Sequence, residues 1–194
     1  MPTPTPTRNR ILETTTELFR RQGYNGTGIK QIVAQAKAPF GSVYHHFPGG
    51  KKQLGAEVIR TAGAMYALLL PAVFDPAPDL VTGAREFFRL AGEQLEESGW
   101  IDACPIAMVA LEVASVNEPL REATRDVFDL WVADGTRFLS EGGLAEDVAR
   151  RLTIGMICAL EGAFVLARAG RTVEPLQAAG ELVAAQLEAE LTRL

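Results

Sequence analysis

Apolar residues recur every three or four positions through most of this sequence, and glycine or proline separates the periodic segments. This spacing is typical of amphipathic helices, in which one stripe of side chains packs into a core. Ala, Leu, Glu and Arg dominate, while β-branched and aromatic runs are sparse, which also favours helices. The pattern predicts an all-α fold of about nine helices, over residues 8–22, 27–36, 39–47, 51–71, 80–97, 102–115, 119–139, 145–169 and 173–193.

Charge is divided unevenly along the chain, whose formal net charge is −5 at pH 7. Residues 1–60 hold nine basic and three acidic side chains, a net of +6, which leaves −11 for residues 61–194. A DNA-binding segment must neutralise phosphates with Lys and Arg. A basic N-terminal third on an acidic remainder therefore indicates a DNA-binding head on a body with another task. The alternative is chance clustering of charge on solvated helix faces.

Residues 27–47 read as two short helices joined by a turn of about three residues. Gly23 is expected to end the preceding helix, and Thr27 to cap the first helix of the pair. Pro39 is disfavoured inside a helix but favoured at its first position, so it marks the start of the second helix. Small side chains allow a tight turn. This is a helix-turn-helix pattern, whose second helix is expected to enter the major groove of DNA.

Fourteen residues within 8–58 fall at the spacing of a known family: Leu18, Phe19, Gly23, Tyr24, Thr27, Ile32, Ala36, Gly41, Tyr44, His45, His46, Phe47, Lys51 and Leu54. This run resembles the N-terminal domain of TetR-family transcriptional regulators. Segments 48–51 and 104–107 resemble the branch that contains the LmrA and YxaF repressors. The resemblance implies a one-component repressor with an N-terminal DNA-binding domain. It also implies a larger C-terminal part that binds a small ligand and forms a dimer.

The expected domains are a disordered Pro/Thr tail over residues 1–7, a helix-turn-helix domain over 8–50 and a ligand-binding and dimerisation domain over 51–194. The tail lacks the apolar core of a signal peptide. No uncharged apolar run reaches the roughly 18 residues needed to span a bilayer. We therefore expect a cytoplasmic protein that does not associate with membranes.

The resemblance assigns phosphate contacts to Thr27, Tyr44, His45 and Lys51, with His46 nearby. Hydroxyl, phenol and ammonium groups suit phosphate oxygens, as do the free amides of a helix N-terminus. The alternative for Tyr44 and Phe47 is that their rings pack in the core. We assign Phe47 to the core and Tyr44 to DNA. The expected DNA-binding residues are Thr27, Gly28, Lys30, Lys37, Phe40, Gly41, Ser42, Tyr44, His45, His46 and Lys51.

Base reading is expected from the exposed face of the second helix, chiefly Phe40, Gly41 and Ser42. Phe40 departs from the family, which often places Lys or another polar residue there. A phenyl ring can only meet a thymine methyl group or stack on an apolar surface. His45 and His46 do not indicate a metal site, because adjacent helical residues point about 100° apart and the sequence has no other histidine.

The last two predicted helices, residues 145–169 and 173–193, are rich in small and apolar side chains. In the resembling family this pair forms a four-helix dimer interface, and the alternative is that the stripes complete the core of one chain. A single head with four or five phosphate contacts would bind weakly at cellular salt. We therefore expect a homodimer that places two heads on a two-fold symmetric site in double-stranded DNA.

Bulky side chains of the middle helices suit an apolar cavity for a small-molecule effector, although such residues more often form ordinary core. Glu112 and Glu161 lie in apolar stretches, where an unpaired carboxylate is costly to bury. A hydrogen bond to a helix terminus, an Arg or the second subunit is favoured over a ligand for both. The expected pocket residues are Met65, Phe88, Trp100, Cys104, Met108, Glu112, Phe128, Trp131 and Glu161.

Other classes of function are less well supported. The sequence has no nucleophile elbow, phosphate-binding loop, dinucleotide fingerprint or metal-ligand cluster, so we expect no catalytic residues, cofactor or metal. Cys104 and Cys158 are expected to be buried, reduced thiols. Two alternatives keep the DNA-binding head: a repressor that senses redox state through these cysteines, and an architectural DNA binder without effector. The segment 51–71 is expected to connect head and body as a lever.

Overall fold

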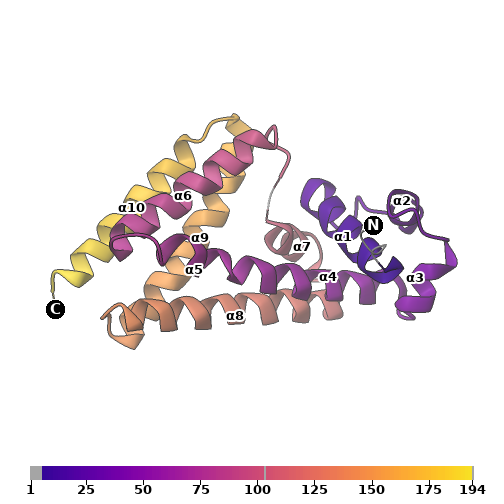
Figure 1. Cartoon of the computed structure of the whole chain (residues 1–194), viewed down its shortest axis with the longest axis horizontal. Coiled ribbons are helices and arrows are strands. Elements are labelled where there is room, and N and C mark those ends of the chain that lie inside the picture. Colours follow the sequence, from indigo (N-terminus) through magenta and orange to yellow (C-terminus); the bar gives the residue numbers. More distant parts are fainter. Residues whose placement is uncertain (1–5, 103, 194) are drawn as a thin grey trace, which may run out of the picture. The chain divides into compact units, whose positions relative to one another are not determined.

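The computed structural model describes residues 6–102 and 104–193, and within them every regular element is a helix (Figure 1). The all-α prediction is confirmed. The helices are α1 (Thr7–Gln22), α2 (Ile29–Gln35), α3 (Gly41–His46), α4 (Gly50–Ala67), α5 (Leu69–Phe74), α6 (Leu80–Glu97), α7 (Pro105–Val113), α8 (Glu118–Glu141), α9 (Glu146–Gly170) and α10 (Glu174–Leu191). Of the predicted tail, residues 1–5 lie outside the described residues.

The helix expected over residues 51–71 is two helices, because Pro71 interrupts the hydrogen-bond ladder. Proline has no amide hydrogen for the carbonyl four residues earlier, and its ring crowds that carbonyl. Leu68 N instead donates to Met65 O at 3.2 Å, and Ala72 N then donates to Leu68 O at 3.2 Å. The described residues therefore contain one helix more than the nine ranges predicted.

The chain divides into two compact units. The head unit comprises Met1–Ala64 and Ala103–Val127, and the body unit comprises Met65–Asp102 and Phe128–Leu194. The boundaries fall inside α4 and α8, so α7 and the first turns of α8 belong to the same unit as α1 to α3. This division concerns packing alone, and the assignment of functions to residues 8–50 and 51–194 stays a prediction.

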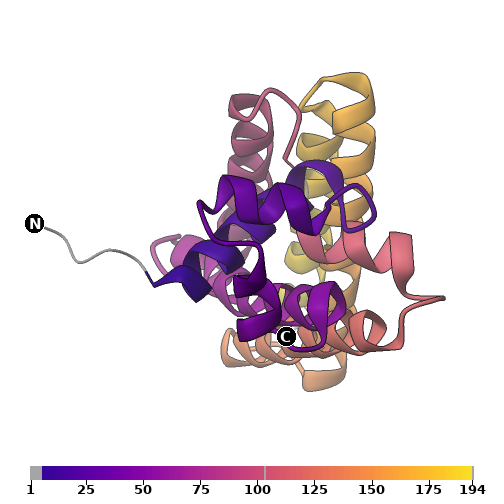
Figure 2. The same ribbon diagram turned by 90° about the vertical axis from the view of Figure 1, so that its right-hand side faces the viewer.

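The core of the head unit forms where α1 packs against α2, α3 and α7. The violet and indigo ribbons of α1 to α3 cross one another rather than run parallel (Figure 2). Their fully buried side chains come from the apolar stripes that the sequence pattern indicates. These include Ile11, Phe19, Ile32, Val43, Phe47 and Leu54. The assignment of Phe47 to the core is confirmed.

The core of the body unit forms mainly where α10 packs against α6 and α9. Phe88 is fully buried there, and a Cβ atom on Gly180 would lie 2.8 Å from the Phe88 Cβ atom. Gly180 therefore lets α10 approach α6 closely. Phe74 extends this core through contacts with Phe87 and Phe138, whose ring centroids lie 6.1 and 5.6 Å from its own. Phe88, expected in the pocket, is thus a core residue between two helices.

The expectation that both cysteines are buried is wrong for Cys158, which is exposed, and Cys104 is only partly buried. Cys158 lies on the face of α9 opposite to the buried Met156 and Ala163. The Cys104 Sγ atom accepts a hydrogen bond from Ala107 N at 3.5 Å and so caps the start of α7. A helical stripe of small residues does not by itself distinguish a core face from an exposed face.

Two helical stretches, Gly50–Phe74 and Glu146–Gly170, have the length and hydropathy of a membrane span. Both contain charged side chains, which is why a search for uncharged runs does not find them. Their composition is weak evidence for a membrane, because core helices of soluble proteins pass the same test.

Candidate nucleic-acid interface

The turn between α2 and α3 is fixed by a side chain from α1. Arg10 Nε donates to Ala36 O at 3.0 Å, and its terminal Nη2 donates to Lys37 O at 3.3 Å. These carbonyls follow the end of α2, where helical carbonyls lack partners and a cation is favoured. Lys37 has a φ of 49°, and Ala38 N donates to Val33 O at 2.9 Å. The turn is therefore closed by its own backbone and held against α1.

The face of α3 that points away from the core carries an aromatic pair. Phe40 and Tyr44 are 51% and 49% exposed, and their ring centroids lie 6.0 Å apart. They stand one helical turn apart, so they share one face. Gly41 and His45 are also exposed, whereas Val43 is fully buried on the opposite side. Phe40, Gly41, Tyr44 and His45, four of the predicted DNA-binding residues, are exposed here.

The remaining predicted DNA-binding residues differ in exposure. Gly28, Lys30 and Lys37 are exposed, and Ser42, His46 and Lys51 are partly buried. The ring centroids of His45 and His46 lie 4.8 Å apart. None of these contacts with DNA is tested by the structure, so all stay predictions.

Thr27 does not occupy the position that the sequence pattern predicts. It is fully buried, and its hydroxyl donates to Gly23 O at 2.7 Å. The N-cap of α2 is Gly28, and no side chain caps that helix. The expectation that Thr27 caps α2 is therefore wrong, because the hydroxyl closes the preceding turn instead. The same bond occupies the hydroxyl that the resemblance assigns to a phosphate.

Lys51 faces the turn between α1 and α2. Its Nζ atom lies 4.0 Å from the ring centroid of Tyr24, a cation–π contact. Burial lowers the pKa of Lys51, and the negative charge of Glu112 opposes that shift. Burial raises the pKa of Tyr24, which a hydrogen bond with the Asn117 side chain partly offsets.

Glu112, expected in the pocket, instead contacts the α1–α2 turn of the head unit. Its Oε2 atom accepts a hydrogen bond from Asn25 N at 2.8 Å. The contact is therefore a hydrogen bond near a helix terminus, one of the partners favoured over a ligand for this carboxylate. The sequence could not identify the partner, because 87 residues separate the two groups.

The other predicted pocket residues are divided between the two units. Cys104, Met108 and Glu112 belong to the head unit, and Met65, Phe88, Trp100, Phe128, Trp131 and Glu161 belong to the body unit. Within the body unit, Trp131 makes edge contacts with Phe128 and Tyr66, at centroid distances of 5.7 and 6.5 Å. The effector pocket as a whole stays a prediction.

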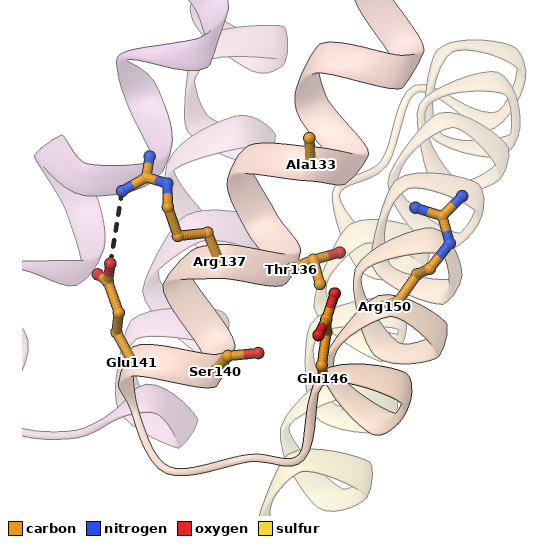
Figure 3. Close-up of a pocket in the computed structure, with 7 residues that line it drawn as sticks. All are labelled: Ala133, Thr136, Arg137, Ser140, Glu141, Glu146 and Arg150. Atoms are coloured by element: carbon orange, nitrogen blue, oxygen red, sulfur yellow. Dashed lines mark ion pairs between the residues drawn. The ribbon is translucent and has the colours of Figure 1, made fainter.

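A hollow of about 570 Å³ lies between α8 and α9 of the body unit (Figure 3). Its lining residues are Ala133, Thr136, Arg137, Ser140, Glu141, Glu146 and Arg150. Figure 3 shows Arg137 turned toward Glu141, with 3.7 Å between their charged atoms. None of these residues was predicted, because charged residues on helices are usually solvated. Six of its seven lining residues carry a polar or charged group, and none of the seven is among the residues predicted for the effector pocket.

Two family models match this chain. The model described as "Bacterial regulatory proteins, tetR family" matches residues 11–58, and "Transcriptional regulator LmrA/YxaF-like, C-terminal domain" matches residues 81–182. The chain belongs to the TetR family of transcriptional regulators. Its helix-turn-helix lies in the first match, and α7 with Glu112 lies in the second.

Relatives and solved structures agree with this assignment. The transcriptional regulators YxaF and LmrA of Bacillus subtilis (strain 168) are 35% and 31% identical over 169 residues, which is 87% of this chain and 88% and 90% of theirs. A TetR transcriptional regulator from Legionella pneumophila has the same fold, with a TM-score of 0.80 at 22% identity over 92% of this chain and 96% of that one. Another, from Chloroflexus aurantiacus J-10-FL, gives 0.74 at 28% identity over 94% of both chains. Regulators of this family bind DNA operators as dimers.

Replacing Gly23 with alanine is expected to lower the free energy of unfolding by about 2 kcal/mol or more. Gly23 ends α1 with φ 73° and ψ −177°, a conformation that is essentially confined to glycine. A Cβ atom there would also lie 1.7 Å from the Glu112 Oε1 atom. Urea denaturation of Gly23→Ala measures the loss.

Making Gly23→Ala in a Glu112→Ala background separates the steric cost of the new Cβ atom from the cost of the backbone conformation. Removing the carboxylate is expected to recover the steric part of the loss but not the backbone part. Equal losses in both backgrounds would show that the carboxylate end of the flexible Glu112 side chain moves aside at little cost.

Proposed function

We propose that this TetR-family regulator is a repressor that binds a palindromic operator as a homodimer and releases it when a small, largely apolar molecule binds. The observation that carries the proposal is the exposed face of α3, where Phe40 and Tyr44 project beside His45. A short helix with an exposed outer face and a buried inner face is the form that enters a major groove. Lys30 and Lys37 supply exposed positive charge nearby in the sequence.

The dimer forms through α9 and α10. Along α9, Ile154, Val165 and Leu166 are exposed in the single chain, and a Cβ atom on Gly155 or Gly162 would meet no neighbour within 4 Å. These five positions and Cys158 fall on one helical face. On α10 an exposed stripe repeats at intervals of three or four residues: Ala178, Leu182, Ala185 and Ala189. Such stripes of small and apolar residues support close packing against a second copy.

The helix connecting the two units carries the response to effector. α4 begins at Gly50, beside α3, and continues across the unit boundary to Ala67. The effector favours a spacing of the two heads that does not fit successive major grooves, about 34 to 36 Å apart. The protein performs this work in the cytoplasm and needs no catalytic residue or cofactor for it.

Fluorescence anisotropy tests the DNA-binding function. The probe is DNA from upstream of the protein's own gene, with a scrambled duplex of equal composition, over a salt series. Wild type is expected to prefer the upstream DNA, and Tyr44→Ala to bind it at least about tenfold more weakly through loss of phosphate contacts at both heads.

Tyr44→Phe is the matched control, because it keeps the ring and removes only the hydroxyl. Equal binding of wild type to both duplexes would favour an architectural DNA binder. Undiminished preference in Tyr44→Ala would remove Tyr44 from the interface.

A further inference from the structure

α7 carries a charged side chain directly to the turn that precedes α2. It packs against α1, although about 80 residues separate the two helices in the sequence. Glu112 Oε2 accepts from Asn25 N at 2.8 Å, so a carboxylate supplies the acceptor for a backbone amide of the turn. Hydrogen bonds to a charged acceptor are about twice as strong as neutral ones. The turn is therefore completed by a residue that lies outside the helix-turn-helix.

The turn leaves room for this carboxylate at Gly23. Gly23 has its Cα atom so close to Glu112 that any Cβ atom would overlap Oε1. Two other amides of the segment bond locally: Gly23 N donates to Phe19 O at 3.0 Å, and Thr27 N donates to Tyr24 O at 3.1 Å. The amide of Asn25 bonds the carboxylate of α7 instead. The missing side chain at Gly23 and the amide of Asn25 therefore both suit the carboxylate of Glu112.

Other groups of the head unit meet at the same turn. Tyr24 makes an edge contact with Phe19, with ring centroids 5.6 Å apart, and Lys51 Nζ of α4 lies 4.0 Å from the Tyr24 ring centroid. The Asn117 side chain, just before α8, lies near enough to the phenol of Tyr24 to lower the pKa of that group. Residues 23–25 are thus contacted from α4, from α7 and from the start of α8. These are the segments through which the chain passes between the two units.

We propose that Glu112 is a positioning residue for DNA binding: its carboxylate holds the α1–α2 turn, and with it the setting of α2, in the DNA-binding arrangement. A displacement of α7 from α1 would free the Asn25 amide and loosen the turn. In the sequence α7 follows α6 of the body unit, so the anchor gives the body a route to the head besides those through α4 and α8. This inference rests on the proposed DNA-binding function.

The experiment compares Glu112→Ala, which removes the acceptor, with Glu112→Gln, which keeps an acceptor oxygen and removes the charge. Both variants remove the charge that faces Lys51, so only the hydrogen bond distinguishes them. Glu118→Ala is the matched control, because Glu118 lies in the same unit and bonds only Arg121 of its own helix in the contacts that the structure describes. Thermal melts establish that each variant is folded at the assay temperature.

Two readouts are taken from each protein. Hydrogen exchange of the Asn25 amide reports the anchor without DNA, and anisotropy on the upstream duplex reports its effect on binding. In Glu112→Ala, Asn25 exchange is expected to rise at least about tenfold and DNA affinity to fall about five- to tenfold. Glu112→Gln is expected to remain within about threefold of wild type in both, and Glu118→Ala to match wild type.

The outcomes separate this inference from the proposed function. If wild type prefers the upstream DNA and Glu112→Ala binds it equally well, the positioning role is overturned and the DNA-binding function stands. If Glu112→Gln loses as much affinity as Glu112→Ala, charge rather than the hydrogen bond is responsible, and the anchor is overturned. If wild type binds no DNA, both proposals fail.

Discussion

Replacing Leu166 with arginine is expected to convert the protein from a dimer to a monomer. Leu166 and its neighbour Val165 are 63% and 60% exposed in the single chain, on the same face of α9 as Gly155 and Gly162. An arginine at a two-fold interface places two like charges against apolar surface, and each lacks a partner there. Sedimentation velocity of wild type and Leu166→Arg measures the change in mass.

Loss of the dimer is expected to remove operator binding. One head contacts few phosphates, whereas two linked heads bind a symmetric site with the second contact made at high effective concentration. Affinity for the upstream DNA is expected to fall by about 1,000-fold at physiological salt. Val116→Arg is the control, because Val116 is 80% exposed and lies between α7 and α8 rather than on α9 or α10. A dimeric Leu166→Arg would place the interface elsewhere.

The sequence predicts most helices well because their limits are local. A 3.6-residue apolar period and a glycine stop can be identified within a few residues, as at Gly23. The break at Leu68 was missed because its cause, Pro71, acts on a carbonyl four residues earlier. Thr27 was misassigned because a threonine before a helix can cap that helix or close the preceding turn. Only the backbone path decides between these two bonds.

The candidate interface is partly predictable for the same reason. The exposed face of α3 follows from helical spacing, so Phe40 and Tyr44 could be selected from the sequence. Contacts between segments that are far apart in the sequence could not be predicted in this way. The sequence shows that Glu112 needs a partner, because it lies in an apolar stretch, but the partner is the amide of Asn25, which carries no side-chain signal. Backbone groups that become partners are set by the packing of helices rather than by residue type.

The Phe40 ring is expected to select operators that carry thymine at the base it meets. A phenyl ring cannot exchange hydrogen bonds with a base edge, and its favourable contact in the major groove is the C5 methyl group of thymine. Phe40 is 51% exposed beside Tyr44, so burying its ring on that methyl group removes apolar area from water at each half-site. Replacing thymidine with deoxyuridine in both half-sites deletes only the methyl groups. Wild-type affinity is expected to fall about 30- to 100-fold, from about 1 kcal/mol or slightly more at each half-site.

Phe40→Ala tests whether the Phe40 ring is the group that contacts the thymine methyl. The variant is expected to bind the thymidine operator about as weakly as wild type binds the deoxyuridine operator, and to respond little to the loss of the methyl groups, because its own contact is already missing. Phe40→Leu keeps an apolar side chain and is expected to retain part of the preference. If the variant and wild type lose equal affinity on deoxyuridine DNA, the methyl groups are read by another residue or act through the shape of the duplex. Phe40 would then contribute to the packing beside Tyr44 rather than to the choice of sequence.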